Sequence, residues 1–184
     1  MTSATILFIH GGGKGAYSED QILFDTLKSY FMERSRFIYP MMPNADSPDY
    51  DEWQETILSR MRQMTGKRIL VGHSFGASIL LKVLSEFKID QAIAGVYLLA
   101  TPYWGAPDWQ ADGYALRENF AEHLQTDVPI FLYHNADDDI VPIAHIDTYT
   151  KHLPKATIRK SETGGHQFWH NIDTLVTDIE QAIS

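Results

Sequence analysis

One serine of this sequence stands where a catalytic nucleophile would be expected. Ser74 is the centre of the glycine-flanked segment 72–76 (GHSFG), which follows an apolar run at 68–71 and precedes a helical pattern. A serine on a tight turn between a strand and a helix exposes its hydroxyl, and the flanking glycines let chain and helix pass closely. The alternative is an ordinary glycine-rich turn, but the strand before it and the helix after it favour a nucleophile.

A histidine base is needed as well, because a serine hydroxyl is a weak nucleophile at neutral pH. Of the eight histidines, His166 is the best candidate, since it follows a Gly-Gly pair just past the last apolar run. Those glycines let the loop approach the nucleophile closely. We expect His145 and His152, which lie on a polar helical pattern, to be solvated, and His73 to pack beneath the site.

Three consecutive acids, Asp137, Asp138 and Asp139, follow the fifth apolar run. One of them is the natural third member of a triad, which orients the imidazole and stabilises its charged form. The alternatives are a cation site or a solvated turn. Because no second carboxylate cluster lies nearby in the sequence, we expect no metal. Spacing alone does not choose among the three acids.

Backbone amides for an oxyanion hole have two sources in the sequence. Phe75, directly after the serine, offers one amide, and the glycine-rich loop at 10–13 offers the other, with Gly12 preferred and Gly11 or Gly13 left open. A phosphate-binding loop is the competing interpretation. It is disfavoured because Lys14 is followed by glycine rather than by Ser or Thr, and the dinucleotide-binding fingerprint is incomplete. We expect no cofactor.

Six short apolar runs, which could form strands, alternate with longer amphipathic stretches. The runs cover residues 5–9, 36–39, 68–71, 95–100, 129–134 and 156–160. Apolar spacing predicts helices over 22–31, 53–64 and 77–84, and further helices near 113–124, 144–152 and 168–182. This alternation predicts a largely parallel sheet with helices on both faces. Ligands bind at the carboxyl ends of such strands, and the serine, the acids and the histidine all come directly after predicted strands. The irregular segment 101–113 is expected to lie over the site.

Length and composition predict a single domain over residues 1–184. The net charge of -9 argues against nucleic acid as the main partner. Without cysteine, a disulfide, a thiolate metal site and a cysteine nucleophile are excluded. The apolar stretch at 6–9 is too short for a signal peptide, and no run approaches the roughly 20 residues of a membrane span. We therefore expect a cytoplasmic protein with no membrane association; a protein partner is not indicated.

The nucleophile segment, the acids and the histidine, in this chain order, resemble the α/β-hydrolase superfamily over nearly the whole chain. More narrowly, the chain is similar to small serine hydrolases related to retinoblastoma-binding protein nine. The matching segments are 42–44 (MPN) before a helix with Trp53, the serine segment 72–76, 138–142 (DDIVP) and 164–166 (GGH).

This resemblance implies a three-layer α/β/α fold with six parallel strands in the order 2-1-3-4-5-6 and no large cap domain. It also implies that the acid stands three residues before Val-Pro, which selects Asp138, with Asp139 as the fallback. One departure is His134-Asn135, where larger members often have His-Gly before the acid. We expect this change to affect only the loop.

Apolar and aromatic residues near the predicted site suit a small apolar acyl or alcohol group. The candidate pocket residues are Met41, Tyr103, Trp104 and Trp169, although such residues also pack cores. The predicted activity is hydrolysis of a small ester, and the same acyl-enzyme chemistry serves thioesters and amides. The alternatives are a binding or scaffolding protein with little turnover and a non-hydrolytic enzyme on the same fold, such as a lyase or perhydrolase.

Overall fold

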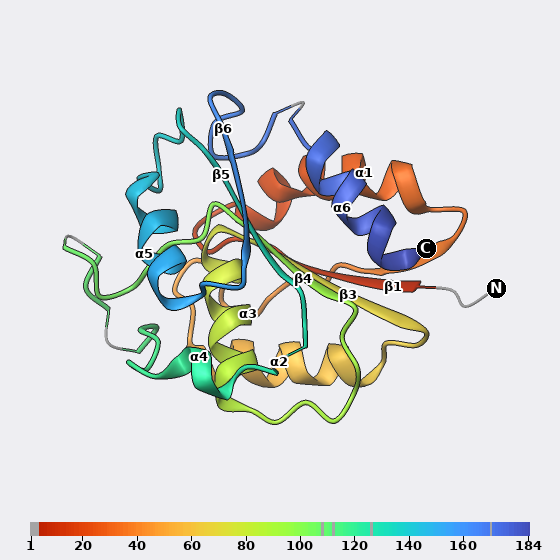
Figure 1. Cartoon of the computed structure of the whole chain (residues 1–184), viewed down its shortest axis with the longest axis horizontal. Coiled ribbons are helices and arrows are strands. Elements are labelled where there is room, and N and C mark those ends of the chain that lie inside the picture. The colour runs from red at the N-terminus through yellow and green to blue at the C-terminus, as the bar shows by residue number, and fades with distance from the viewer. Residues whose placement is uncertain (1–3, 108, 112, 126, 170) are drawn as a thin grey trace.

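The computed structural model describes residues 4–107, 109–111, 113–125, 127–169 and 171–184. His170, inside the predicted helix 168–182, lies outside the described residues. Strands and helices alternate along the chain (Figure 1). The strands are β1 (Ala4–Ile9), β2 (Ser35–Ile38), β3 (Lys67–His73), β4 (Gly95–Leu99), β5 (Ile130–Asn135) and β6 (Thr157–Ser161). The helices are α1 (Ala16–Phe31), α2 (Tyr50–Arg62), α3 (Ser74–Glu86), α4 (Phe120–His123), α5 (Ala144–His152) and α6 (Asp173–Ile183).

The six strands form one sheet in the order β2-β1-β3-β4-β5-β6, and every pairing is parallel. Each strand overlaps one of the six predicted apolar runs. Parallel strands are covered on both faces and therefore read as continuous apolar runs, which is why the sequence predicts them well. The fold and the strand order expected from the resemblance are confirmed.

Alternate residues of each strand feed two separate cores, one on each face of the sheet. Leu7, Leu70 and Leu98 face the core beneath α2, α3 and α5. Ile6, Ile69 and neighbouring residues face the core beneath α1 and α6. Figure 1 shows the same division, with α1 and α6 on one side of the sheet and α2 and α3 on the other.

The predicted helix over 113–124 is wrong in extent, because only Phe120–His123 is helical. The preceding segment is held by tertiary contacts instead. The Tyr114 hydroxyl donates to the carbonyl of Pro48 (2.6 Å), and Lys82 Nζ donates to the carbonyl of Ala115 (2.8 Å). The second bond satisfies the Ala115 carbonyl, a backbone group that would otherwise be paired within a helix.

The buried face of α1 takes in only part of the apolar spacing that predicted the helix. Ile22 and Tyr30 are exposed, whereas Leu23, Phe24 and Asp20 are buried. An acid therefore lies on the face that packs against the sheet. A buried carboxylate needs compensating partners, and those partners are in the site.

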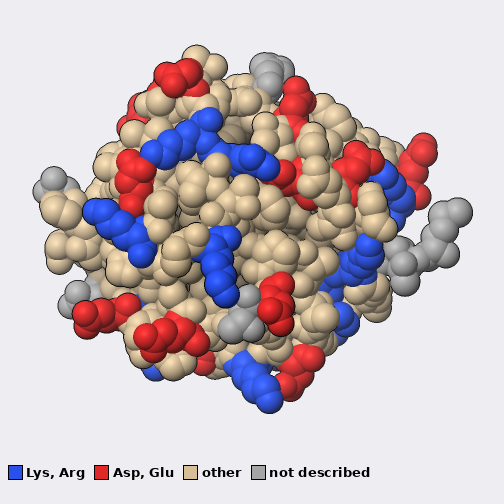
Figure 2. All heavy atoms as spheres, viewed as in Figure 1, with Lys and Arg blue, Asp and Glu red and all other residues tan. Residues whose placement is uncertain are grey.

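The surface carries charges of both signs, and acidic and basic side chains are interspersed on the face that Figure 2 shows. Within the described ranges, no helix is both long and apolar enough to cross a membrane.

Candidate active site

Ser74 lies on a strained turn between β3 and α3. β3 ends at His73 and α3 begins at Ser74, whose φ is +52°. A non-glycine residue in this region of backbone space carries strain, as expected of a nucleophile elbow. Neither flanking position has room for a side chain. A Cβ on Gly72 would lie 2.6 Å from Ala77 Cα, and one on Gly76 would collide with the carbonyl oxygen of His10. The steric reason for both glycines is confirmed.

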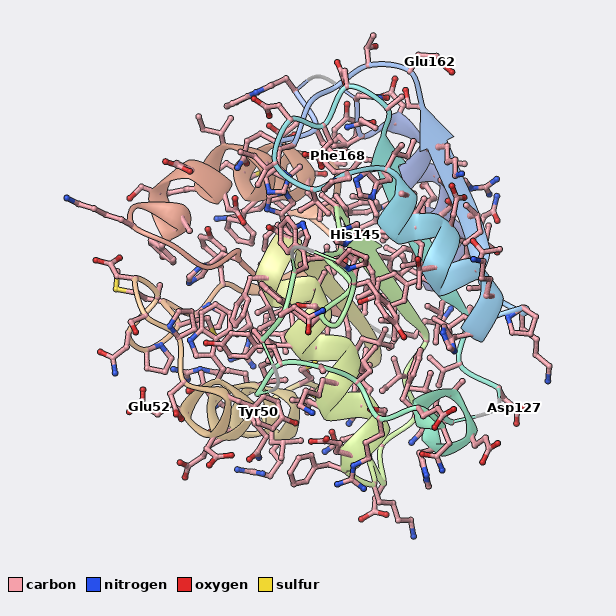
Figure 3. All side chains as sticks on the ribbon, turned by 90° about the vertical axis from the view of Figure 1, so that its left-hand side faces the viewer. Tyr50, Glu52, Asp127, His145, Glu162 and Phe168 are labelled. Atoms are coloured by element: carbon pink, nitrogen blue, oxygen red, sulfur yellow. The ribbon has the colours of Figure 1, made fainter. Side chains whose placement is uncertain are left out.

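A cavity of about 440 Å³ brings the loops after several strands together around Ser74. Its lining residues come from the β1 loop and α1, the β3 turn, the β5 loop and the β6 loop: Gly11, Gly12, Ala16, Glu19, Asp20, His73, Ser74, Asp139, Ile140, Gly165, His166, Gln167 and Trp169. Figure 3 views the side of the molecule on which the strands end, and it labels Phe168, which belongs to the loop after β6.

His166 is bound to Asp138 by its Nδ1 atom, at 3.0 Å from Oδ1 and 2.9 Å from Oδ2. Its side chain is 10% exposed, while that of Asp138 is 1% exposed. Because Nδ1 contacts the carboxylate, Nε2 is the ring nitrogen left for other chemistry. His166 and Ser74 line the same cavity, and the hydrogen bond to Asp138 fixes the orientation of the His166 ring.

Asp138 is held as a carboxylate by several donors. The amides of Ile140 and Val141 donate to its Oδ1 at 2.9 and 2.8 Å, and His134 Nε2 lies 3.4 Å from its Oδ2. Burial alone would raise the pKa of this carboxyl, but hydrogen bonds from His134, His166 and Val141 hold the pKa well below its usual range. The group is thus ionised and able to stabilise a charged imidazole.

The three consecutive acids have three different environments. Asp137 accepts hydrogen bonds from the amides of Gly164 (3.2 Å) and Gly165 (2.8 Å). Asp138 binds the ring of His166, and Asp139 is exposed at the cavity. The geometry therefore agrees with the choice of Asp138, and it gives Asp137 a separate task in shaping the histidine loop.

Asn135, the departure noted in the sequence, also supports that loop. Its Nδ2 donates to the carbonyl of Gly165 (2.8 Å), and its Oδ1 accepts from Asn171 Nδ2 (3.2 Å). A Cβ on Gly164, whose φ is +137°, would lie 2.6 Å from Asn135 Nδ2. The Gly-Gly pair therefore allows the loop to pass close to β5.

The loop after β1 packs against the start of α3. Gly12 lines the cavity, and a Cβ there would lie 3.1 Å from the Phe75 ring. Phe75 is the second residue of α3, where amide groups have no partner within the helix. His10 Nε2 accepts from the amide of Met42 (3.0 Å), so Nδ1 carries the proton that it donates to the carbonyl of Gly11 (2.6 Å). The loop is therefore anchored on its far side.

A second acid–histidine pair lines the same cavity, and its acid is not predicted from the sequence. Asp20 Oδ2 accepts from His73 Nδ1 at 2.7 Å and from the amide of Gly11 at 2.8 Å. The one signal for it in the sequence is an acid at position 20, in register with the buried residues Ala16, Leu23 and Leu27 of α1. His73 is buried, as expected.

The predicted pocket residues separate into two groups. Trp169 lines the cavity with Ser74 and is half exposed. Met41, which is 71% exposed, lines a neighbouring hollow beside Tyr17. Tyr103 and Trp104 pack against the core around α3 and are not among the residues that line the Ser74 cavity.

His145 is not solvated as expected; it is buried, and its Nδ1 accepts from the amide of Tyr103 (2.8 Å). Figure 3 places His145 near the centre of this side of the molecule. Burial lowers the pKa of His145, so it serves as a neutral acceptor that fixes the segment after β4. Among the residues that the structure describes, no group of three or more His, Asp or Glu side chains is arranged to hold a metal ion.

A family model described as serine hydrolase matches residues 25–177. The chain belongs to the serine hydrolase family. The matched range includes Ser74, Asp138 and His166. A search of curated proteins finds no match.

Several solved structures have the same fold, and they align with almost the whole length of this serine hydrolase. The ydeN gene product of Bacillus subtilis is 18% identical, with a TM-score of 0.74 and 98% of each chain covered. SOBER1 of Arabidopsis thaliana is 14% identical, with a TM-score of 0.72 and coverage of 99% of this chain and 100% of that chain. The esterase domain of a Rhodothermus marinus protein is 16% identical, with a TM-score of 0.66 and coverage of 97% and 84%.

At these identities the solved structures establish the fold, and the family model establishes the family. The resemblance to α/β hydrolases is confirmed. The narrower relation to proteins related to retinoblastoma-binding protein nine stays a prediction.

Proposed function

We propose that this serine hydrolase cleaves small carboxylic esters through an acyl-enzyme on Ser74. The observation that carries the proposal is that His166, anchored to an ionised Asp138, shares a cavity with a serine on a strained strand-to-helix turn. A nucleophile, a base and a group that orients the base are the three parts of such a mechanism.

In the first step, His166 Nε2 takes the proton of the Ser74 hydroxyl as the serine oxygen attacks the ester carbonyl. The imidazolium that forms is stabilised by Asp138, and the amides of Gly12 and Phe75 donate to the oxyanion. Collapse breaks the bond to the alcohol, which leaves with the proton from His166. Water, deprotonated by His166, then attacks the acyl carbonyl; the serine takes the proton back and the acid is released.

The cavity supports a preference for small substrates that carry no negative charge. Its volume of about 440 Å³ suits a group of modest size, with Ile140 and Trp169 as apolar walls. Among the described lining residues there is no Lys or Arg, while Glu19 and Asp139 are exposed carboxylates. An anionic ester would meet repulsion without a compensating cation.

A fluorophosphonate probe tests the nucleophile, because it forms a covalent adduct with an activated serine. We expect one equivalent of label on the wild type and none on Ser74→Ala. Ser85→Ala is the matched control: Ser85 is a buried serine of the same helix, and its hydroxyl donates to the carbonyl of Lys82 (2.8 Å). That variant should label like the wild type. Absence of label on folded wild type would contradict the proposal.

A panel of p-nitrophenyl esters of increasing acyl length then tests the substrate class. We expect hydrolysis of short neutral esters, lost in Ser74→Ala and kept in Ser85→Ala. A binding or scaffolding protein would neither label nor turn over. A lyase or perhydrolase on the same fold would label, but its products would differ from the free acid and alcohol that our proposal requires.

A further inference from the structure

Asp20 and His73 form a buried pair, which we call the sealed pair, and it links three loops of the site. Asp20 lies on α1, and its Oδ2 accepts from the amide of Gly11 in the loop after β1. His73 ends β3 and directly precedes Ser74. Its Nε2 lies 2.9 Å from the carbonyl oxygen of His166, in the loop after β6.

The hydrogen-bonding pattern fixes the protons of this pair. A carbonyl oxygen can only accept, so His73 Nε2 carries a proton that it donates to His166. Nδ1 faces the Asp20 carboxylate at 2.7 Å, and the side chains of His73 and Asp20 are 1% and 2% exposed. Burial opposes the charge on both groups. Their mutual attraction and hydrogen bonds outweigh it, so the pKa of His73 is raised and that of Asp20 is lowered.

Other ionisable groups near His73 are His166, Asp138 and His10. The rings of His73 and His166 are 4.8 Å apart between centroids. The carboxylate of Asp138 favours the charged form of His73, and a charge on His73 disfavours one on His10, whose pKa is lowered first by burial. An ionised Asp20 beside a doubly protonated His73 is therefore the state consistent with every contact.

We infer that Asp20 and His73 are positioning residues that set the distance between the oxyanion loop, the nucleophile and the base. One end of the pair holds Gly11 next to Gly12, and the other holds the backbone of His166, while His73 itself is covalently joined to Ser74. A displacement of about 1 Å between reacting groups can lower a rate by about 100-fold, so a rigid link at this place has a direct effect on turnover.

This inference rests on the proposed function, and its test compares two variants of His73. In His73→Gln the amide nitrogen can replace Nε2 and donate to the His166 carbonyl, but the bond to Asp20 is lost. In His73→Asn the shorter amide can replace Nδ1 and donate to Asp20, but the bond to His166 is lost. Both leave Asp20 without its countercharge, so both remove the same electrostatic contribution.

We expect kcat for a short p-nitrophenyl ester to fall by about 10- to 100-fold in His73→Asn, with KM within about twofold. His73→Gln should retain several-fold more kcat than His73→Asn, because it keeps the base in place. Asp20→Asn, which removes the charge while keeping an oxygen for Gly11, should also lower kcat more than it changes KM.

Asp178→Asn is the matched structural control. Asp178 is also a buried helical acid, and it is bound by Tyr133 (2.7 Å) and Arg159 (2.9 Å) on β5 and β6. We expect it to lower the midpoint of urea unfolding and to leave kcat within about twofold. If the His73 and Asp20 variants lower the midpoint but leave kcat unchanged, or if the two His73 variants lose kcat equally, the positioning role is wrong. Turnover that survives Ser74→Ala would instead refute the proposed function, whatever the His73 variants do.

Discussion

The protein contains two acid–histidine pairs within one site, and they differ in what surrounds the histidine. His166 binds Asp138 through Nδ1 and turns its other side to the cavity, with 10% of the side chain exposed. His73 binds Asp20 through Nδ1 and the His166 carbonyl through Nε2, with 1% exposed. The same two residue types thus give an open pair with a free nitrogen and a sealed pair with none. A base needs a free nitrogen that can exchange protons with substrate or water, and a structural link needs every donor occupied.

The largest expected effect comes from removing the ring of the open pair. His166→Ala should lower kcat/KM for a short ester by about 10⁴-fold, because the base that takes the Ser74 proton is removed. The backbone carbonyl that accepts from His73 remains, so the midpoint of urea unfolding should change little. Steady-state kinetics and urea titration check the two parts. Substantial turnover in folded His166→Ala would mean that the open pair is not the base.

Asp138→Asn should have the next largest effect, lowering kcat by about 10³- to 10⁴-fold. The amide cannot stabilise the imidazolium, and its nitrogen would face the Nδ1 proton. Asp137→Asn is a useful comparison, since Asp137 accepts hydrogen bonds from the amides of Gly164 and Gly165 and not from the His166 ring. It should cost less than Asp138→Asn, because an amide oxygen can still accept from one of them. A larger loss in Asp137→Asn would contradict the assignment of the acid.

The sealed pair should be visible in the pH dependence of stability. The pKa of His73 is raised above 6.5 in the folded protein. Its contribution to stability is therefore complete below pH 6.5 and is lost as the pH rises through the folded pKa. In Asp20→Asn, burial of His73 is no longer offset by a carboxylate, so the folded pKa should fall below 6.5. In that variant the contribution of His73 to stability increases as the pH rises toward 6.5.

The measurement is the free energy of unfolding in urea between pH 5.5 and 8.5. The difference in free energy of unfolding between Asp20→Asn and the wild type should become smaller as the pH rises. The same difference for Asp178→Asn should not change with pH over this range, since the side chains that bind Asp178 are Tyr133 and Arg159 rather than a histidine. A flat difference for Asp20→Asn as well would show that His73 is not charged in the folded wild type.

The two pairs also differ in how far the sequence could predict them. The open pair follows the carboxyl ends of β5 and β6, and parallel strands bring such loops to one edge, so Asp138 and His166 could be found from position and resemblance. Asp20 lies near the start of α1, and an acid on a helix normally faces solvent. The signal that the sequence holds is the helical spacing of position 20 from Ala16, Leu23 and Leu27. Ile22 and Tyr30 obscure it, because they make a second face of the helix look apolar.

The pocket was the least predictable part. Strand positions follow from local apolar runs, whereas the walls of a cavity depend on how irregular segments fold over it. Tyr103 and Trp104 pack inward because their partners, His145 and Ser78, come from other elements (Tyr103 amide to His145, 2.8 Å; Trp104 Nε1 to Ser78, 2.9 Å). Nothing within residues 101–113 encodes those partners.

The smallest effect is expected at Asp139, a cavity acid that belongs to neither pair. It lines the cavity and is exposed, so Asp139→Asn should change kcat/KM for a neutral ester by less than about twofold. For an ester with a carboxylate on the acyl chain, the same variant should raise kcat/KM by a few fold, because one of two exposed acids that repel it is removed. Added salt should reduce that gain, since it screens exposed charges. A comparison of neutral and anionic esters at low and high ionic strength makes the test. A large loss on the neutral ester would place Asp139, rather than Asp138, in the open pair.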